Sequence, residues 1–199
     1  MHIANSSSTA PKFPLVPVRG RTGRGWVIAL SLLLGAGPFH AQAAETLVAN
    51  EPELRAAIII GILRFTAWQP PTAGDLRLCI LGLPVSAPAL LSLPEDTRIG
   101  TQALHTRAVD ARAARMSECD IVVMGPGQDA ASAKVTLQEA NHQGVLTICD
   151  GCGHHAEYSM VTLTRHEGRI GFEIDTQIAQ TNGLQFSSDL LELAVRVRP

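Results

Sequence analysis

The sequence predicts an α/β protein: a three-layer α/β/α sandwich whose mixed, mostly parallel sheet carries a late β-hairpin and a C-terminal helix. Strand patterns alternate with helical patterns from residue 50 to 149, which is typical of a parallel sheet covered by helices. A turn sequence at 166–168 separates two later strand patterns and predicts the hairpin. Hydrophobic residues make up 46% of the 199 residues and charged residues 17%, which indicates a folded globular protein.

Residues 1–43 have the pattern of a secretory signal peptide. They contain no acidic residue, and a basic region precedes the apolar run at 26–37 and an A-x-A sequence at 41–43. The basic residues just before the run are Arg19, Arg21 and Arg24. The run is shorter than the ~20 residues of a membrane span, so a single N-terminal anchor is the less favoured alternative. We expect cleavage after Ala43, which leaves a single domain at 44–199 in an oxidising, periplasm-like compartment.

The charge of the chain changes once this leader is removed. All 18 acidic residues lie from Glu45 onward, whereas four of the 16 basic residues lie in the leader, so the remaining body has 12 positive and 18 negative side chains and a net charge of −6. An acidic body argues against a nucleic-acid partner, because phosphate binding requires a basic face.

The first predicted helix begins at Asn50, a capping residue, with Glu53 three residues later. Apolar residues then recur at helical spacing, and we expect the helix to end near Trp68 because two prolines follow at 70–71. The next predicted elements are a buried strand at 76–82, a short helix at 87–93, a polar strand at 104–109 and a β-branched strand at 119–124.

The second half of the body continues the alternation. Its predicted elements are a helix at 128–142, a strand at 145–149, the hairpin strands at 160–164 and 169–174, and helices at 176–180 and 190–197. Gly144 ends the first of these helices, and the sequence Ser-Ser-Asp at 187–189 caps the last one.

The segment 125–130 fits the pattern G-x-G-x-x-A between a strand and a helix, and Asp150 lies 25 positions beyond Gly125, as in a dinucleotide-binding loop. It follows the third strand rather than the first, so we interpret it as a tight strand-to-helix turn and predict no cofactor. The chain has no G-x-S-x-G or H-E-x-x-H motif, and five scattered histidines follow the leader. We therefore predict a protein that is not an enzyme and holds no metal.

Two cysteines lie in predicted buried strands, Cys79 and Cys119, forty positions apart. If the strands are neighbours, a disulfide between them is within reach, and closing that loop stabilises the fold by about 4 kcal/mol in the chain-entropy model. The alternative is a pair of buried free thiols, which export to an oxidising compartment disfavours.

The other two cysteines, Cys149 and Cys152, form a C-x-x-C sequence with three interpretations. In a thioredoxin-like redox pair the first cysteine lies at the N-terminus of a helix and its thiolate attacks a disulfide, but no helical pattern follows this strand. A metal site with His154 and His155 lacks a second ligand pair, and adjacent histidines do not easily face one ion. The favoured interpretation is a small structural or regulatory disulfide in a glycine-rich loop.

The order of these segments resembles the YfiR family of periplasmic proteins. The resemblance is carried by the helix that ends in an aromatic residue before Pro70, the strand at 76–82 with its cysteine, the cysteine-led strand at 119–123, and the tail at 168–194. The tail is the most specific part, and the resemblance spans nearly all of the chain after the leader.

The resemblance implies a regulatory role. Proteins of this family are periplasmic repressors that bind the periplasmic domain of an inner-membrane diguanylate cyclase, which keeps cyclic di-GMP low and restrains biofilm formation. An OmpA-like outer-membrane lipoprotein sequesters the repressor and releases the cyclase. Family members dimerise, and their disulfide state affects stability and activity.

Cys79 and Cys119 match the strand-to-strand disulfide of the family. The close pair Cys149 and Cys152 does not, because related proteins place a second bridge on cysteines further apart. No partner-contact residue carries over. Two other classes of function stay open: a periplasmic thiol oxidoreductase that uses Cys149 and Cys152, and a small-ligand or metal sensor built on the loop at 149–158. A regulatory protein should also leave an apolar patch exposed for its partner.

Overall fold

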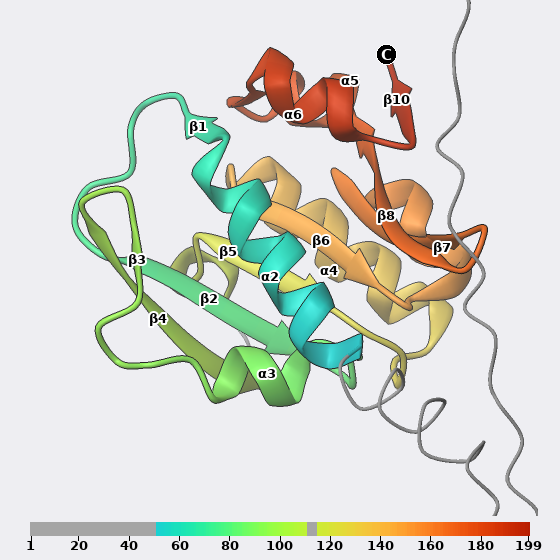
Figure 1. Ribbon diagram of the computed structural model, residues 1–199, viewed down its shortest axis with the longest axis horizontal. Coiled ribbons are helices and arrows are strands. Elements are labelled where there is room, and N and C mark those ends of the chain that lie inside the picture. Colours follow the sequence, from blue (N-terminus) through green and yellow to red (C-terminus); the bar gives the residue numbers. More distant parts are fainter. Residues whose placement is uncertain (1–50, 111–114) are drawn as a thin grey trace, which may run out of the picture. The chain divides into compact units, whose positions relative to one another are not determined.

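The computed structural model describes residues 51–110 and 115–199, which form an α/β domain around one eight-stranded sheet and a separate two-stranded ribbon (Figure 1). The predicted signal peptide and its cleavage site lie outside the described residues.

The helices of the described residues are α2 (Glu51–Arg64), α3 (Ala87–Leu91), α4 (Ala130–His142), α5 (Thr176–Thr181) and α6 (Ser188–Leu193), with the 3-10 helices η1 (Met116–Glu118) and η2 (Gly153–Tyr158). The strands are β1 (Thr66–Trp68), β2 (Leu76–Leu81), β3 (Arg98–Ile99), β4 (Gln102–Val109), β5 (Ile121–Met124), β6 (Leu146–Asp150), β7 (Val161–His166), β8 (Arg169–Asp175), β9 (Leu184–Phe186) and β10 (Arg196–Arg198).

The eight strands of the large sheet lie in the order β10-β8-β7-β6-β5-β2-β4-β3. The strands from β7 to β4 run parallel to one another, whereas β8 and β3 run antiparallel to β7 and β4. The predicted mixed, mostly parallel α/β sandwich with a late hairpin is therefore confirmed. Because β4 lies on one side of β2 and β5 on the other, the chain reverses its direction of travel at β2, which is the topological switch point of the sheet.

Alternate residues of each strand pack into two separate cores, one on each face of the sheet. On one face, Leu78 and Ile80 of β2 join a cluster that includes Ile59 and Leu63 of α2. On the other face, Cys79 and Leu81 of β2 join a second cluster, which includes Leu137 and Ala140 of α4. Figure 1 shows α2 crossing the near face of the sheet, with α4 behind it.

Two helix ends differ from the sequence prediction. Helix α2 ends at Arg64 rather than near Trp68, because residues 66–68 leave the helix and pair as β1 with β9. The predicted helix at 190–197 ends at Leu193, and the chain then forms β10 beside β8. In both cases a strand pairing formed by distant residues overrides the local helical pattern. The capping serine was predicted correctly, since Ser187 Oγ accepts a hydrogen bond from the Leu190 N–H at 3.3 Å.

The turn after β5 approaches the turn after β2 so closely that only glycine fits at one position. A Cβ atom on Gly125 would lie 2.0 Å from the Pro84 nitrogen and 2.4 Å from the Leu83 carbonyl carbon. A Cβ atom on Gly61, inside α2, would meet nothing within 4 Å apart from its chain neighbours and the backbone of its own helix. Gly61 can therefore serve as the control for Gly125, because a side chain fits at Gly61 and does not fit at Gly125.

We expect Gly125→Ala to lower the free energy of unfolding by about 3 kcal/mol, because backbone atoms of the neighbouring turn must move. Gly61→Ala should raise it by about 0.5–1 kcal/mol, because alanine restricts the unfolded chain and favours helix. Urea unfolding of both oxidised variants measures the difference. Equal effects of the two substitutions would contradict the close approach of the turns.

Candidate functional site

The two disulfides and the charged side chains beside them are the most distinctive features of the described residues. The first disulfide joins Cys79 in β2 to Cys119, two residues before β5, with their Cα atoms 5.8 Å apart. Both cysteines are buried, and both belong to the core on the α4 side of the sheet. The bridge therefore fastens the central strand to the start of the strand beside it.

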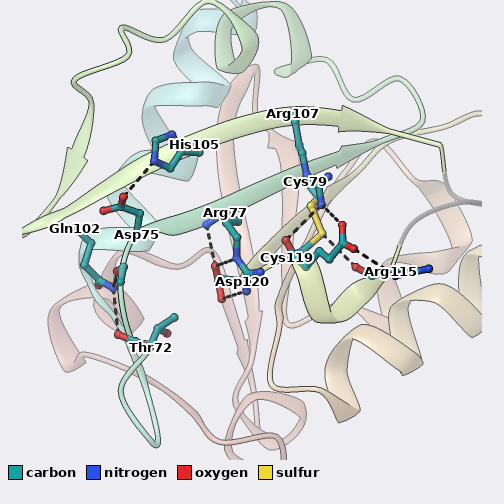
Figure 2. A network of polar contacts seen from close by, with 12 residues as sticks. Thr72, Asp75, Arg77, Cys79, Gln102, His105, Arg107, Arg115, Cys119 and Asp120 are labelled. Atoms are coloured by element: carbon teal, nitrogen blue, oxygen red, sulfur yellow. Dashed lines mark hydrogen bonds and ion pairs between the residues drawn. A yellow bond between two sulfur atoms is a disulfide. The ribbon is translucent and has the colours of Figure 1, made fainter.

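A second link lies next to this disulfide and joins the same two strands. Asp120 accepts three hydrogen bonds from Arg77: the backbone N–H and Nε both donate to Oδ2 at 2.9 Å, and Nη2 donates to Oδ1 at 3.0 Å (Figure 2). These hydrogen bonds raise the pKa of the Arg77 guanidinium above its usual value. Because the carboxylate is nearly buried and held by the two-pronged guanidinium, this ion pair has a fixed geometry.

The outer rim of this network consists of exposed ion pairs. Arg107 donates to Glu118 at 3.1 Å, and Arg115 lies 4.0 Å from the same carboxylate. Further along the strands, His105 lies 3.3 Å from Asp75, and hydrogen bonding to this imidazole lowers the pKa of the Asp75 carboxyl (Figure 2). Solvent-exposed pairs of this kind contribute little to stability, so the disulfide and Asp120 hold the strands together.

The second disulfide joins Cys149, near the end of β6, to Cys152, with Cα atoms 5.6 Å apart. The residues are only 1% and 6% exposed. Thiol exchange requires that an attacking thiolate reach one of the two sulfur atoms, which this burial disfavours. The structure also places the 3-10 helix η2 directly after Cys152, where the sequence indicated no helical pattern.

The metal interpretation of this loop also lacks support in the structure. His154 and His155 lie in η2 beside the disulfide. Among residues 51–110 and 115–199, however, no group of three or more His, Cys, Asp or Glu side chains is placed to hold a metal ion. Both sulfur atoms of the adjacent pair are in a disulfide, and a thiolate ligand would require that bond to be reduced.

Asp150, between the two cysteines, is fully buried at the end of β6. Its Oδ1 accepts a hydrogen bond from Arg55 Nη1 at 2.6 Å, and its Oδ2 accepts one from the Ser86 N–H at 2.8 Å. Arg55 also donates through Nε to Glu51 at 2.8 Å, and Glu51 accepts a further hydrogen bond from Arg165. Four alternating charges thus connect the disulfide loop to the first turn of α2 and to β7.

Hydrogen bonding from Arg55 lowers the pKa of Glu51 below its usual value of 4.5. The unfolded chain therefore binds a proton at Glu51 more readily than the folded chain does. By linkage, the stability that this carboxylate contributes is present above pH 4.5 and is lost as the pH falls through the lower, folded-state pKa.

The positions of two carboxylates exclude the dinucleotide-loop interpretation of 125–130. Asp129 caps α4, where its Oδ1 accepts a hydrogen bond from the Ser132 N–H at 3.0 Å, so a negative charge already occupies the position of a bound phosphate. Asp150, the candidate ribose ligand, is buried against Arg55. The segment is instead the tight turn that the sequence favoured.

Apolar side chains remain exposed at the end of the chain, on the edge of the sheet. Leu193 is 69% exposed, Val195 47% and Val197 39%. The Val195 N–H donates to the Phe172 carbonyl at 2.8 Å, which fixes this segment against β8. We call these three residues the C-terminal apolar row. These exposed apolar side chains lie beside the open edge of β10, and exposed apolar groups of this kind are a common feature of protein-binding sites.

None of the helices in the described residues is long and apolar enough to cross a membrane. The described residues form a disulfide-braced α/β domain with an exposed apolar row at one edge of its sheet. The YfiR/HmsC-like family model matches residues 52–195, and the chain belongs to this family. It is a family of periplasmic regulators of the diguanylate cyclase pathway, regulatory rather than catalytic.

Among solved structures, the comparison finds a match to the crystal structure of a conserved domain protein from Vibrio cholerae O1 biovar El Tor strain N16961. It has 12% sequence identity and a TM-score of 0.49, and the alignment covers 74% of this chain and 60% of that one. No curated protein sequence matches the chain.

The Cys79 bridge should dominate the stability of the domain. We expect Cys79→Ser to lower the free energy of unfolding by about 4 kcal/mol, because the closed loop restricts the unfolded chain. Thermal unfolding of the oxidised protein measures this loss. Adding a thiol reductant should destabilise the parent protein more than the Cys79→Ser variant, and alkylation of both Cys79 and Cys119 in freshly exported, non-reduced protein would contradict the bridge.

Asp150→Asn should lower the free energy of unfolding by about 3 kcal/mol, because it removes one of the two carboxylates that pair with the buried guanidinium of Arg55. The matched control is Glu118→Gln, which removes one exposed carboxylate and should cost less than about 1 kcal/mol. Chemical denaturation of both variants tests the difference. A cost for Asp150→Asn no larger than that of the control would show that the buried network does not stabilise the domain.

Proposed function

We propose that this protein represses an inner-membrane diguanylate cyclase by binding its periplasmic domain, which lowers cyclic di-GMP and restrains biofilm formation. The observation that carries the proposal is the family match over residues 52–195. Two further features support it: a domain braced by two disulfides and the exposed C-terminal apolar row.

The proposal requires export. We propose that residues 1–43 are a signal peptide cleaved after Ala43, and that residues 44–199 are the single mature domain in the periplasm. The two disulfides support this location, because disulfides form and persist in an oxidising compartment. Since both bridges stabilise the scaffold, reduction should weaken repression.

We propose the C-terminal apolar row as the contact surface for the cyclase. Large apolar side chains at the end of α6 and along the edge strand β10 bury area on binding with little loss of conformational freedom. A homodimer, or an OmpA-like outer-membrane lipoprotein that sequesters the repressor, would compete with the cyclase if it covered the same row.

Co-purification of the exported protein with the periplasmic domain of its cognate cyclase tests the central proposal. We expect a complex at micromolar concentrations and an increase of cellular cyclic di-GMP when the gene is deleted. The absence of both effects would disprove the repressor function. A complex without a change in cyclic di-GMP would disprove the repression but not the binding.

Leu193→Glu should weaken the complex at least tenfold, because a carboxylate placed within an apolar contact must lose its hydration. Leu83→Glu is the matched control, because Leu83 is 75% exposed in the turn after β2 and lies outside the row. Titration calorimetry with the cyclase domain compares the two variants, whose melting temperatures should match. If Leu83→Glu weakens binding and Leu193→Glu does not, the partner binds elsewhere.

A further inference from the structure

Helix α2 is apolar around almost its whole circumference. Its residues 56–63 read Ala-Ala-Ile-Ile-Ile-Gly-Ile-Leu and include no polar side chain. A helix on a protein surface normally turns polar residues toward solvent, whereas a helix that is hydrophobic all round is normally buried. Figure 1 shows α2 crossing the sheet with no other described element in front of it. The helix therefore turns an apolar side toward solvent.

Five residues at helical spacing form this side, which we call the outer face of α2. They are Leu54, Ala57, Ile58, Gly61 and Phe65, which directly follows the helix. Leu54 is 49% exposed and Phe65 is 42% exposed, so a large apolar side chain stands at each end of the face. A Cβ atom on Gly61 would meet nothing outside its own helix and chain neighbours. The middle of the face is thus low enough for a second helix to approach closely.

The helix on the opposite side of the sheet has the pattern expected of a solvent-facing surface. The outward positions of α4 include Ser132, Lys134, Gln138 and Glu139, all of which are exposed. The two helices cover the same sheet and have nearly the same length. The apolar outer face is therefore a property of α2 and not of the architecture, and exposed apolar patches of this kind mark interaction surfaces.

Two unpaired charges lie at opposite ends of the outer face. Glu53 is in the first turn of α2 and Arg64 is in the last turn. Eleven positions correspond to about three turns, so the two side chains leave the helix on the same side. Both residues are exposed, and among residues 51–110 and 115–199 neither has an ion-pair partner, in contrast to Arg55. The face is consequently complementary in charge to a reversed copy of itself.

We propose that the outer face of α2 is the interface of a symmetric homodimer in which the α2 helices of two copies pack antiparallel. A twofold axis near the middle of the helix brings Glu53 to Arg64 of the partner subunit, and the same contact occurs a second time by symmetry. Leu54 packs against Phe65 of the partner subunit, and Ala57 and Gly61 allow the close approach between them. A second copy has the complementary charges in the required order, which an unrelated partner would have to match separately.

Antiparallel packing also places opposite ends of the two helix dipoles side by side, which is favourable. The interface contains no residue of the C-terminal apolar row, so the proposal does not rest on the binding of a cyclase. The dimer can be tested with this protein alone.

Sedimentation velocity of the oxidised, exported protein at increasing concentration tests the proposal. We expect a monomer that converts to a dimer as the concentration rises. Ala57→Glu should weaken the dimer at least tenfold, because two carboxylates must be desolvated near the twofold axis. The matched control is Ala131→Glu, the same change at an exposed position of α4, which should leave dimerisation unchanged. Melting temperatures show whether both variants are folded.

A protein that stays monomeric in the millimolar range would overturn the proposal. A dimer that Ala57→Glu leaves intact would also overturn it, because that dimer must use another surface.

Charge reversal tests the antiparallel arrangement. Glu53→Lys and Arg64→Glu should each weaken the dimer about fivefold, because each change places like charges together at two symmetric contacts. The double variant Glu53→Lys/Arg64→Glu should recover most of the parent affinity, because the reversed charges are complementary again. The measured quantity is the dimer dissociation constant from sedimentation equilibrium. A double variant at least as weak as the product of the two single losses would overturn the antiparallel pairing.

Discussion

The disulfide between Cys79 and Cys119 is the constraint on which the rest of the structure depends. It lies at β2, the strand where the chain reverses its path through the sheet, and it holds the start of β5 beside that strand. In its described part, the β4–β5 connection contributes only the 3-10 helix η1 to this face. The covalent bond, with Asp120 bound by Arg77 beside it, thus fastens β2 to the start of β5 within the core that α4 covers.

The buried carboxylate of Asp150 has a comparable role at the other end of the sheet. It fixes the second disulfide loop to α2 through Arg55 and to the turn before α3 through the backbone of Ser86. A charge buried in this way is stable only while its partners stay in place. The loop that carries Cys149 and Cys152 is consequently part of the folded core, and this burial favours a structural or regulatory bridge over an exchanging one.

A scaffold fixed at both ends can present a binding surface without changing shape. The C-terminal apolar row borders the β10 edge of this scaffold. We propose this exposed hydrophobic surface as the contact for a protein partner, because apolar side chains that are already held in place lose little conformational freedom on binding.

The sequence by itself determined the class of fold, the strands of the parallel core and the hairpin. Runs of β-branched residues favour strands, and glycines favour turns, through interactions between residues that are close in the sequence. The sequence also favoured a bridge between Cys79 and Cys119, which matches the disulfide of the family, but only the structure showed that β2 and β5 are neighbours. The tertiary structure alone decided that α2 ends at Arg64 and that the chain ends in β10, since both follow from pairing with distant strands. It alone placed Asp150 against Arg55, 95 positions away, because no local pattern encodes an ion pair between segments that meet only in the folded chain.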